Sequence, residues 1–444
     1  PFLWRRCGQN PLQLLQEVSP ERLQAAASDQ GFLALYDAVM AGLDTYMSAQ
    51  GGTWFAAHQG GRLPGPIAYF AMEYGLHLSL PLYAGGLGVL GGDTCKEASD
   101  LGLPLVALGL MYSHAFYQRM SPEGWQGEVY RDLNHPGAPI KPVPSPQGGR
   151  ALAQVPLGDR TVSLGAWLVQ VGRVPLYLLT TDIEENSPED RQLLSWLYVS
   201  EPEPRLQQEV LLGIGGVRLL RALGIRPSFW HANEGHTAFM MLERIREEVV
   251  GGAPFPEAQQ RVASATLFTL HSPRPASTDI FPVHLLEQYI PGYWELLGID
   301  KETFLRLGFD ERSGAEAFNM TALGLRLAGH CNAVSRLHGE VARRVWHTLW
   351  PQVKAEEAPI SYVTNGVHLP TWIAPEMAGL LEKYLGRDWP HKQDDPALWE
   401  RLLRVPEEEV WAVHMLLKRR MLGVLRDQAR GAWAVSVSRS GRRQ

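Results

Sequence analysis

Five glycines fall within eight positions at the start of an expected helix, and this stretch constrains the fold more than any other. They stand at positions 85, 86, 88, 91 and 92 of the segment YAGGLGVLGGDTCKEASDLGLPLVALGL, residues 83–110. Residues 66–73 have a short apolar strand pattern, residues 87–101 a helical pattern, and residues 103–112 a second apolar strand pattern. Strand, helix and strand in this order predict a βαβ unit, whose two strands lie parallel in one sheet.

The glycines at the helix start also indicate a binding site. Glycine inside a helix is less favourable than alanine by roughly 1 kcal/mol, so its presence needs a reason. Gly85, Gly86 and Gly88 would let a ligand approach the backbone, where the first N–H groups of the helix and its dipole attract a phosphate or carboxylate. A tight turn explains them about as well. The stretch has no Walker lysine, so a nucleoside triphosphate is not indicated. For Gly91 and Gly92 we expect close packing of the helix on the sheet.

Strand and helix patterns alternate along most of the chain. After the helical region 11–46, in which Ser19 is a good N-cap before Pro20, comes a Gly-rich stretch, 50–65, that is typical of a linker. Residues 131–165 predict loops with an edge hairpin. Further strand patterns occupy 167–179, 228–230, 265–270 and 360–363, and further helical patterns occupy 205–223, 318–344 with a break around 331–335, and 407–430. This alternation predicts an α/β fold with a mostly parallel, doubly wound sheet.

The last fourteen residues, 431–444, differ from the rest. They show neither a helical period nor turn residues, and Arg439, Arg442 and Arg443 have no acidic partner nearby in the sequence. Such a tail is either a basic arm for nucleic acid or a segment cut or translated out of register.

Composition and charge narrow the classes of function. The formal net charge of -6 argues against nucleic acid as the main partner, because phosphate contacts need a basic face. Cys7, Cys95 and Cys331 form no CxxC pair, which suits reduced thiols in a cytoplasm. The longest apolar run, residues 103–111, fits a buried strand and is too short to span a membrane. The 14 Trp suffice for a site that stacks sugar rings, although core packing is the commoner role of each.

The segment WHANEGHTAF, residues 230–239, lies where a strand ends and a helix begins. We expect Asn233 to cap that helix, with Glu234 and His236 near the carboxyl edge of the sheet, where ligands bind in α/β folds. His231 and His236 are five residues apart rather than four, and no HExxH is present, so a metal site is not indicated.

Three other polar segments stand out, two after expected strands and one at the break in the helical pattern 318–344. They are His271-Ser272-Pro273, SRLHGE at 335–340, and Thr364-Asn365-Gly366. Each has an ordinary structural explanation as a turn or a solvated helix start. Their joint occurrence at strand ends is the stronger indication of a site.

In this order, these segments resemble the α-glucan phosphorylase family in its shorter bacterial and archaeal form. The resembling segments are AYFAMEYGLHLSLPLYAGGLGVLGGD, FWHANEGHTAF, FPVHLLEQYIP, FNMTALGLRL, NAVSRLHGEVARRVW and YVTNGVHLPTW. The resemblance covers most of residues 10–425. It implies the GT-B architecture, two Rossmann-like domains facing each other across a cleft, and cleavage of the terminal α-1,4 bond of glycogen or maltodextrin by inorganic phosphate to give glucose 1-phosphate.

The resemblance also implies roles for individual residues. The amides of Gly85, Gly86, Leu87 and Gly88 would face the phosphates, and His271 would contact the glucosyl ring. Asn365 would bind the 6-hydroxyl. The same pocket would be lined by Asn233, Glu234 and His236. The family uses pyridoxal phosphate through its phosphate group, as the proton-relay partner of the substrate phosphate.

Two departures from the family pattern stand out. The residues after His271 read Ser-Pro-Arg-Pro-Ala-Ser-Thr-Asp where the family has a Thr-Pro continuing to Gly-His-Asp. The cofactor lysine of the family lies in a Gly-rich Met-Lys motif of the second Rossmann-like domain, and none of this chain's lysines (96, 141, 301, 354, 383, 392 and 418) stands in such a motif.

These departures set the expected domain organisation. We expect a helical region at 1–60, the first Rossmann-like domain at 61–366, the opening helices of the second at 367–430, and an unmatched tail at 431–444. The second Rossmann-like domain is expected to be largely absent from this chain, which would then be truncated and nearly inactive alone. A glycogen synthase-like transferase using a nucleotide sugar, and a non-catalytic glucan-binding fragment, remain as alternatives.

Overall fold

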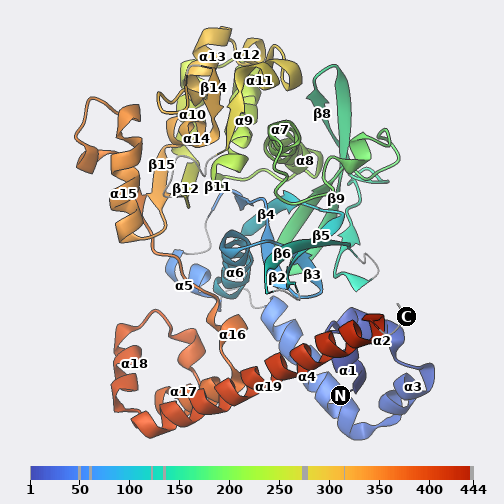
Figure 1. The fold of residues 1–444 in the computed structure, drawn as a ribbon. Coiled ribbons are helices and arrows are strands. Elements are labelled where there is room, and N and C mark those ends of the chain that lie inside the picture. The colour runs from blue at the N-terminus through green and yellow to red at the C-terminus, as the bar shows by residue number, and fades with distance from the viewer. Residues whose placement is uncertain are drawn as a thin grey trace. The chain divides into compact units, whose positions relative to one another are not determined.

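The computed structural model describes residues 2–48, 52–59, 63–121, 124–133, 137–272, 279–314 and 316–440, and their side chains apart from those of 59, 428 and 431–440. The chain forms two compact units, Pro1–Gly366 and Val367–Gln444, each with its own hydrophobic core (Figure 1).

The larger unit is built on a ten-stranded sheet in the order β16-β15-β12-β11-β1-β4-β10-β9-β7, with β8 paired to β9. All strands from β16 to β10 run parallel, and only the β9 edge is antiparallel. The predicted doubly wound α/β class is therefore confirmed. The strands are β1 (Ile67–Phe70), β4 (Leu105–Leu110), β7 (Lys141–Pro142), β8 (Ala153–Leu157), β9 (Arg160–Val171), β10 (Val174–Thr180), β11 (Phe229–Asn233), β12 (Thr266–Leu270), β15 (His330–Ala333) and β16 (Ser361–Tyr362).

The strand order reverses between β1 and β11. From β1 the chain moves outward through β4 and β10, and it then returns to β11 and moves the other way through β12, β15 and β16. In open parallel sheets the ligand crevice lies beyond the carboxyl ends of the strands at this reversal. The segments that follow β1 and β11 are therefore the first place to look for a site.

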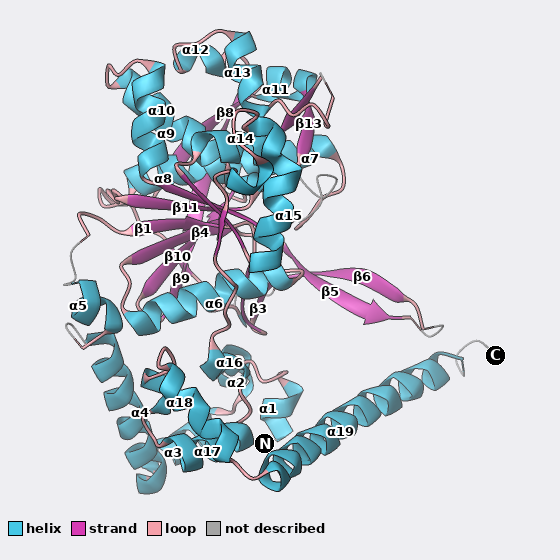
Figure 2. Ribbon diagram, turned by 90° about the vertical axis from the view of Figure 1, so that its left-hand side faces the viewer, coloured by secondary structure: helices cyan, strands magenta, loops and turns pink. Residues whose placement is uncertain are grey.

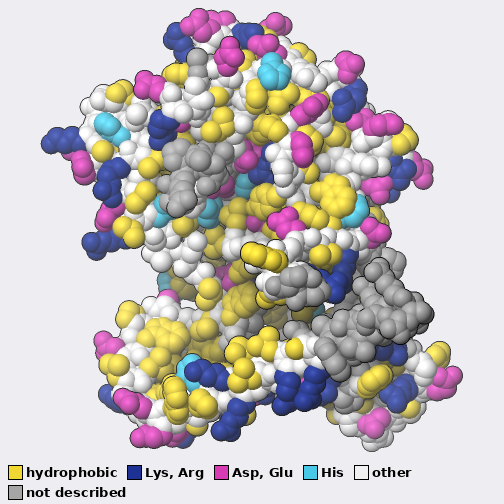
Figure 3. All heavy atoms as spheres, in the orientation of Figure 1, with side chains coloured by type: hydrophobic (Ala, Val, Ile, Leu, Met, Phe, Trp, Pro, Cys, Tyr) yellow, Lys and Arg dark blue, Asp and Glu magenta, His cyan; other side chains and the backbone are white. Residues whose placement is uncertain are grey.

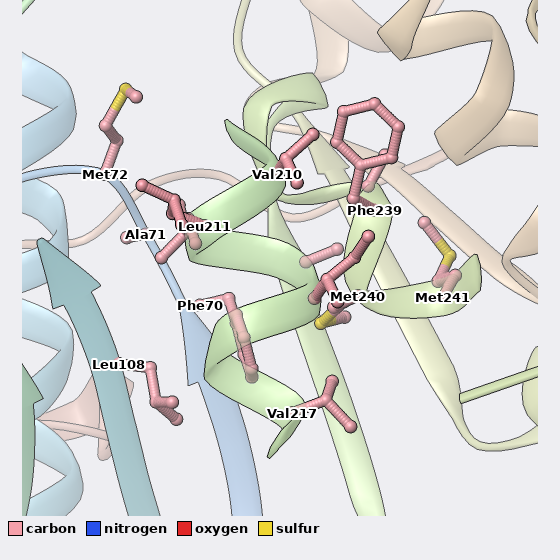
Figure 4. Packing of buried hydrophobic residues seen from close by; sticks show 14 of the residues in the cluster. Phe70, Ala71, Met72, Leu108, Val210, Leu211, Val217, Phe239, Met240 and Met241 are labelled. Carbon is pink, nitrogen blue, oxygen red and sulfur yellow. The ribbon is translucent and has the colours of Figure 1, made fainter. Parts of the chain in front are cut away.

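Helices cover both faces of the sheet (Figure 2). On one face lies a continuous helical run of α7 (Pro202–Val210), a π-helical turn (Leu211–Gly215) and α8 (Gly216–Ala222), and α9 (Phe239–Val250) packs on that run. Phe70 and Leu108, from neighbouring strands, point toward the run (Figure 4). A Cβ on Gly216 would lie 2.6 Å from the Phe70 ring, so glycine permits this close helix–sheet approach.

The expected βαβ unit is present, with α6 (Gly86–Leu101) between β1 and β4. A hairpin of β2 (Tyr74–His77) and β3 (Leu80–Leu82) precedes the helix. Gly92 explains how closely α6 packs, because a Cβ there would overlap the carbonyl oxygen of Gly75. A Cβ on Gly91 would lie 3.0 Å from the Glu73 carbonyl oxygen, a tight but less severe approach. Both glycines therefore serve close packing, but against the 73–75 segment rather than the main sheet.

Residues 2–48 form α1 (Phe2–Arg6), α2 (Pro11–Glu17), α3 (Pro20–Ser28) and α4 (Gln30–Ser48). Ser19 caps α3 as predicted, its side chain accepting from the Arg22 amide. The end of α4 is fixed to the sheet domain, because the Tyr46 hydroxyl bonds Ser99 at 2.5 Å and donates to Asp100 at 2.6 Å. Arg173 also lies over the Tyr46 ring, 3.9 Å from its centroid.

Several predicted boundaries were wrong for identifiable reasons. The Gly-rich stretch 50–65 contains α5 (Trp54–Gln59), whose Trp54 ring stacks on His58. The strand pattern 167–179 is two strands, β9 and β10, which turn at Gly172 with a positive φ of 55°. The helical pattern 318–344 contains a buried strand, β15, between α14 (Met320–Leu327) and α15 (Arg336–Trp346), because a short apolar strand and a buried helix have similar patterns.

Other elements of this unit had no distinct sequence signal. A hairpin of β5 (His114–Met120) and β6 (Gln126–Asp132) extends away from the sheet (Figure 2). A small pair, β13 (Ile280–Pro282) with β14 (Ala317–Asn319), packs against α11 (Val283–Tyr289) and α13 (Lys301–Gly308). Helices α10 (Phe255–Ser264) and α12 (Tyr293–Leu296) both contact α9.

The smaller unit is helical, with α16 (Leu369–Trp372), α17 (Pro375–Leu385), α18 (Pro396–Glu400) and α19 (Glu407–Ser440). Leu381, Leu385, Trp389 and Leu398 form its core. The backbone of α19 continues to Ser440, which differs from the irregular tail predicted at 431–444; residues 441–444 lie outside the described part. Lys and Arg side chains gather along α19 (Figure 3). Across the described residues, no helix is both long and apolar enough to cross a bilayer.

The contact at Gly92 gives a first test of the packing. Gly92→Ala would force α6 away from the Gly75 carbonyl, and we expect a loss of about 1–3 kcal/mol in stability, as for other over-packed sites. Gly86→Ala is the matched control on the same helix, because a Cβ there meets no atom within 4 Å. Thermal denaturation of both variants checks this, and equal melting temperatures for the two would contradict it.

Candidate functional site

A cavity of about 500 Å³ lies at the carboxyl ends of the central strands. Its lining comes from segments far apart in the sequence: Leu87 from the first turn of α6, Tyr198 and Arg205 from the α7 region, and residues that follow β11 and β12. The last group consists of Glu234, His236, His271, Ser272 and Asp279. The cavity therefore lies at the reversal of the strand order, where a ligand site is expected.

The glycine loop forms one side of this region, and Glu73 holds it. The Glu73 carboxylate accepts from the amides of Ala84, at 2.5 Å, and Gly85, at 3.3 Å. A Cβ on Gly88 would lie 2.7 Å from this carboxylate. At Gly86 a Cβ would meet open space.

The first turn of α6 consequently keeps free hydrogen-bond donors. Within the part of the chain that the structure describes, no acceptor bonds the amides of Gly86, Leu87 and Gly88, and Leu87 lines the cavity. Three unpartnered amides at the N-terminus of a sixteen-residue helix suit an anion.

Two residues of the cavity have a strained backbone. Tyr198 has a φ of 57° and Glu234 a φ of 84°, which residues other than glycine rarely adopt. Each is held by a strong side-chain contact: the Tyr198 hydroxyl donates to Glu73 at 2.6 Å, and Glu234 accepts backbone amides. Strain retained by such contacts is typical of functional sites.

The Glu234 carboxylate accepts three backbone N–H groups. These come from His271 at 2.7 Å, Ser272 at 3.2 Å and Gly235 at 3.1 Å. Glu234 thus joins the ends of β11 and β12. Burial raises the pKa of this carboxyl to about 7, although the three amide bonds act in the opposite direction.

Asn233 and His271 form a second link between these strands. The His271 Nε2 and the Asn233 Oδ1 are 2.7 Å apart, so this nitrogen carries the proton. Asn233 is therefore not the helix cap that the sequence predicted. The helical turn after β11 (Gly235–Thr237) follows Glu234 instead, whose side chain bonds its first amide, and α9 begins only at Phe239.

The imidazoles of this region are uncharged near neutral pH. Burial lowers the pKa of His271 and of His231 to about 4 and that of His236 to about 3. The polar contacts continue behind them, since His231 bonds Thr269, whose hydroxyl donates to Asn332 at 2.7 Å. Neutral imidazole and amide groups are suited to hydroxyl groups, which carry no charge.

Arg205 is the cation among the described residues that line the cavity, and carboxylates surround it. Its guanidinium donates to both oxygens of Asp279, at 3.2 and 3.0 Å, and lies 3.0 Å from the buried Glu209. Burial opposes the charge of Arg205, but these carboxylates raise its pKa overall. Burial and the neighbouring Asp279 raise the pKa of Glu209 well above its ordinary value. Arg205 is thus neutralised within the protein.

Within the described residues, two buried polar nitrogens beside the cavity have no hydrogen-bond partner. They are the Asn233 Nδ2 and the His236 Nε2, on residues that are 1% and 2% exposed. Buried polar groups are almost always satisfied, so these two atoms indicate a polar ligand or ordered water at this place.

The structure brings several of the predicted site residues together and leaves others outside the cavity lining. Gly85, Gly86 and Gly88 flank Leu87 but are not lining residues. His271, Glu234, His236 and Leu87 line the cavity, and Asn233 bonds His271. The Asn365 side chain is exposed and outside the lining, while its amide donates to the Val334 carbonyl. The departure from the family pattern at 273–278 lies outside the described residues.

Sequence reasoning missed three groups that organise the site. Glu73 directly follows β1 at the reversal, and a carboxylate at that position was a usable signal. Arg205 and Glu209 are spaced like a solvent-exposed helical ion pair, so their burial could not be foreseen. Asp279 joins them only through the tertiary fold.

The chain is similar in sequence to several named proteins. The chain is 42% identical to the maltodextrin phosphorylase of Thermococcus litoralis over 94% of its own length and 49% of that protein's. It is 40% identical to a glycogen phosphorylase of Mycobacterium tuberculosis (98% of this chain, 52% of the relative) and 37% identical to one of Aquifex aeolicus (98% and 61%).

The chain is a homologue of the α-glucan phosphorylases. The predicted resemblance is thereby confirmed. Residues 1–80 also match a family model described as a protein of unknown function, DUF3417. The chain spans about half the length of the curated relatives it matches.

The pKa of Glu234 gives a test of the site's electrostatics. A carboxyl whose pKa is about 7 when folded and about 4.3 when unfolded destabilises the fold as pH rises between these values, because its charged form is disfavoured by burial. Glu234→Gln removes the titrating carboxyl, and it also replaces one of the two acceptor oxygens with an NH₂ group. We therefore expect the melting temperature of the variant, measured relative to that of the wild type, to rise between pH 5 and pH 8.

The same melts of Glu287→Gln, which replaces a half-buried carboxyl outside the cavity that is paired with Lys301, provide the control and should show no such trend. A difference between wild type and Glu234→Gln that stays constant over this range would mean that Glu234 titrates normally.

Proposed function

We propose that this chain carries the sugar-binding part, and one side of the phosphate-binding part, of an α-glucan phosphorylase. The reaction would transfer the terminal α-1,4-linked glucosyl unit of glycogen or maltodextrin to inorganic phosphate. The glycosidic C1–O bond breaks, a bond from C1 to a phosphate oxygen forms, and the departing sugar oxygen takes a proton, giving glucose 1-phosphate.

The observation that carries this proposal is the pairing of two kinds of donor at one cavity. The unpartnered Asn233 Nδ2 and His236 Nε2 lie beside the neutral His271, a set that suits sugar hydroxyls. The open amides of Gly86, Leu87 and Gly88 suit a phosphate. Arg205 is already paired with Asp279, so its charge is not available to bind that phosphate. A neutral sugar next to an anion is the combination that phosphorolysis requires.

Glu234 and Glu73 act as positioning residues in this proposal. Glu234 fixes the His271 amide and so the position of the imidazole, which bonds Asn233. Glu73 fixes the start of α6, so the amides are aimed before any ligand arrives. Donors that are already oriented stabilise developing charge without reorganisation.

The named relatives also bring pyridoxal phosphate into the proposal, through the family to which they belong. The α6 amides fit the phosphate of such a group or of the substrate. An aldehyde group is held by a lysine amine, and the described residues that line the cavity include no lysine. These residues therefore do not fit the aldehyde of pyridoxal phosphate. When bound, the group would supply a phosphate that exchanges a proton with the substrate phosphate, and the residues of this chain would hold the sugar beside it. We also propose a cytoplasmic location, which the three buried, unpaired cysteines support.

The activity of the 444-residue chain tests the proposal directly. Mixed with maltoheptaose, phosphate and pyridoxal phosphate, it should bind the glucan but form little or no glucose 1-phosphate, because none of its lysines stands in the cofactor motif. Robust turnover, or a borohydride-trapped lysine, would contradict the expected inactivity. Absence of glucan binding would contradict the proposed function itself.

Two substitutions separate the sugar contacts. His271→Ala should weaken binding of maltoheptaose by roughly tenfold, the effect of losing one well-oriented hydrogen bond and the contacts of the ring. Asn365→Ala tests the family-based role of Asn365 in binding the 6-hydroxyl, because the exposed side chain stands outside the cavity in this structure. Isothermal titration gives both affinities, and an unchanged affinity in Asn365→Ala would remove that residue from the site.

A further inference from the structure

A second cavity, of about 570 Å³, opens beside the base of the β5–β6 hairpin. It is lined by His114 and Ser113, by Asp182 and Arg191 from the turn after β10, and by Ser195 and Trp196. None of these residues takes part in the proposed transfer reaction.

Trp196 is held rigidly at this cavity. The His114 ring stacks on it with centroids 3.9 Å apart and planes 5° apart, and His114 in turn bonds the Ser195 carbonyl at 3.1 Å. Tyr130 packs edge-on against the indole, with centroids 4.9 Å apart, and donates to the Leu197 carbonyl. Trp196 nevertheless stays 40% exposed. An aromatic ring that is fixed yet exposed loses little conformational entropy when it binds a ligand.

The polar groups of this cavity are arranged without net charge. Arg191 donates to Asp182 through Nε at 2.7 Å, and its Nη2 lies 2.6 Å from the same oxygen. Because the pair is neutralised internally, the cavity has little attraction for an anion, while its planar polar side chains can still bond hydroxyl groups. A pyranose ring has the matching chemistry, with an apolar C–H face for the indole and hydroxyls around its edge.

The second cavity is joined to the first by a short segment of chain. Ser195 and Trp196 line the second cavity, and Tyr198 and Ser200 line the first. The Gln208 side chain fixes this segment to α7 by donating to the carbonyls of Leu193, at 3.1 Å, and Trp196, at 3.0 Å. The linings of the two cavities therefore share one segment of chain, residues 195–200.

We propose that this second cavity is an additional binding subsite for a neutral α-glucan chain, with one sugar ring stacked on Trp196. The inference rests on the proposed function, because it assigns a further part of the same substrate. It adds a residue, Trp196, that governs affinity for long glucans without taking part in bond cleavage.

The experiment measures binding of maltoheptaose and of glucose to the 444-residue chain by isothermal titration. Trp196→Ala should bind maltoheptaose roughly tenfold more weakly, the loss typical of a buried aromatic anchor, with glucose binding unchanged. Trp54→Ala is the matched control, because Trp54 is 39% exposed and also stacks on a histidine but lines neither of these cavities. Its affinities should equal those of the wild type.

Trp196→Phe distinguishes loss of the stacking ring from loss of the fold. It keeps a smaller aromatic ring at the same place, so its affinity for maltoheptaose should lie between those of the wild type and Trp196→Ala. Equal maltoheptaose affinity in Trp196→Ala and the wild type would overturn the subsite while leaving the proposed function intact. An equal loss in Trp54→Ala would overturn it as well. A wild-type chain that binds no maltoheptaose would overturn the proposed function and the subsite together, a result distinguishable from the others.

Discussion

The buried carboxylate of Glu73 is the interaction on which the rest of the site depends. It lies just after the central strand, is 2% exposed, and accepts from two amides before α6 and from the Tyr198 hydroxyl. One side chain therefore fixes the end of β1, the start of α6 and the segment before α7 relative to one another. Without it, the loop before α6 would lose the acceptor of two amides, and the strained Tyr198 would lose its hydroxyl bond and keep its contact with Arg205.

The charges of the site follow a consistent arrangement. Arg205 is surrounded by Asp279 and by Glu209, whose pKa burial raises, and the nearby histidines are neutral through burial. The remaining electropositive feature at the described cavity lining is a set of backbone amides at a helix start. Backbone amides cannot titrate and cannot rotate away, so the anion position is fixed by the fold rather than by a flexible side chain.

How much of this was predictable differs from residue to residue. The parallel sheet, α6 and the clustering of Asn233, Glu234 and His271 at strand ends follow from local patterns and from the rule that strand ends meet at one edge. The role of Asn233 did not follow, because Ser, Asn and Asp before a helix usually cap it, whereas here the tertiary fold places His271 within bonding distance. Arg205 with Glu209, and His114 with Trp196, pair only after folding, and no spacing along the chain reports that.

The glycines at the start of α6 are required for two separable reasons. At positions 88 and 92 the protein itself leaves no room for a side chain, whereas at 85 and 86 a Cβ would meet nothing, and the extended backbone of Gly85 is open to any residue. Selection for stability alone would therefore keep glycine at 88 and 92 and let 85 and 86 drift to larger residues. Glycine at 85 and 86 would be retained only under selection for what binds there, so the tolerance of these four positions separates the demands of the fold from those of the ligand.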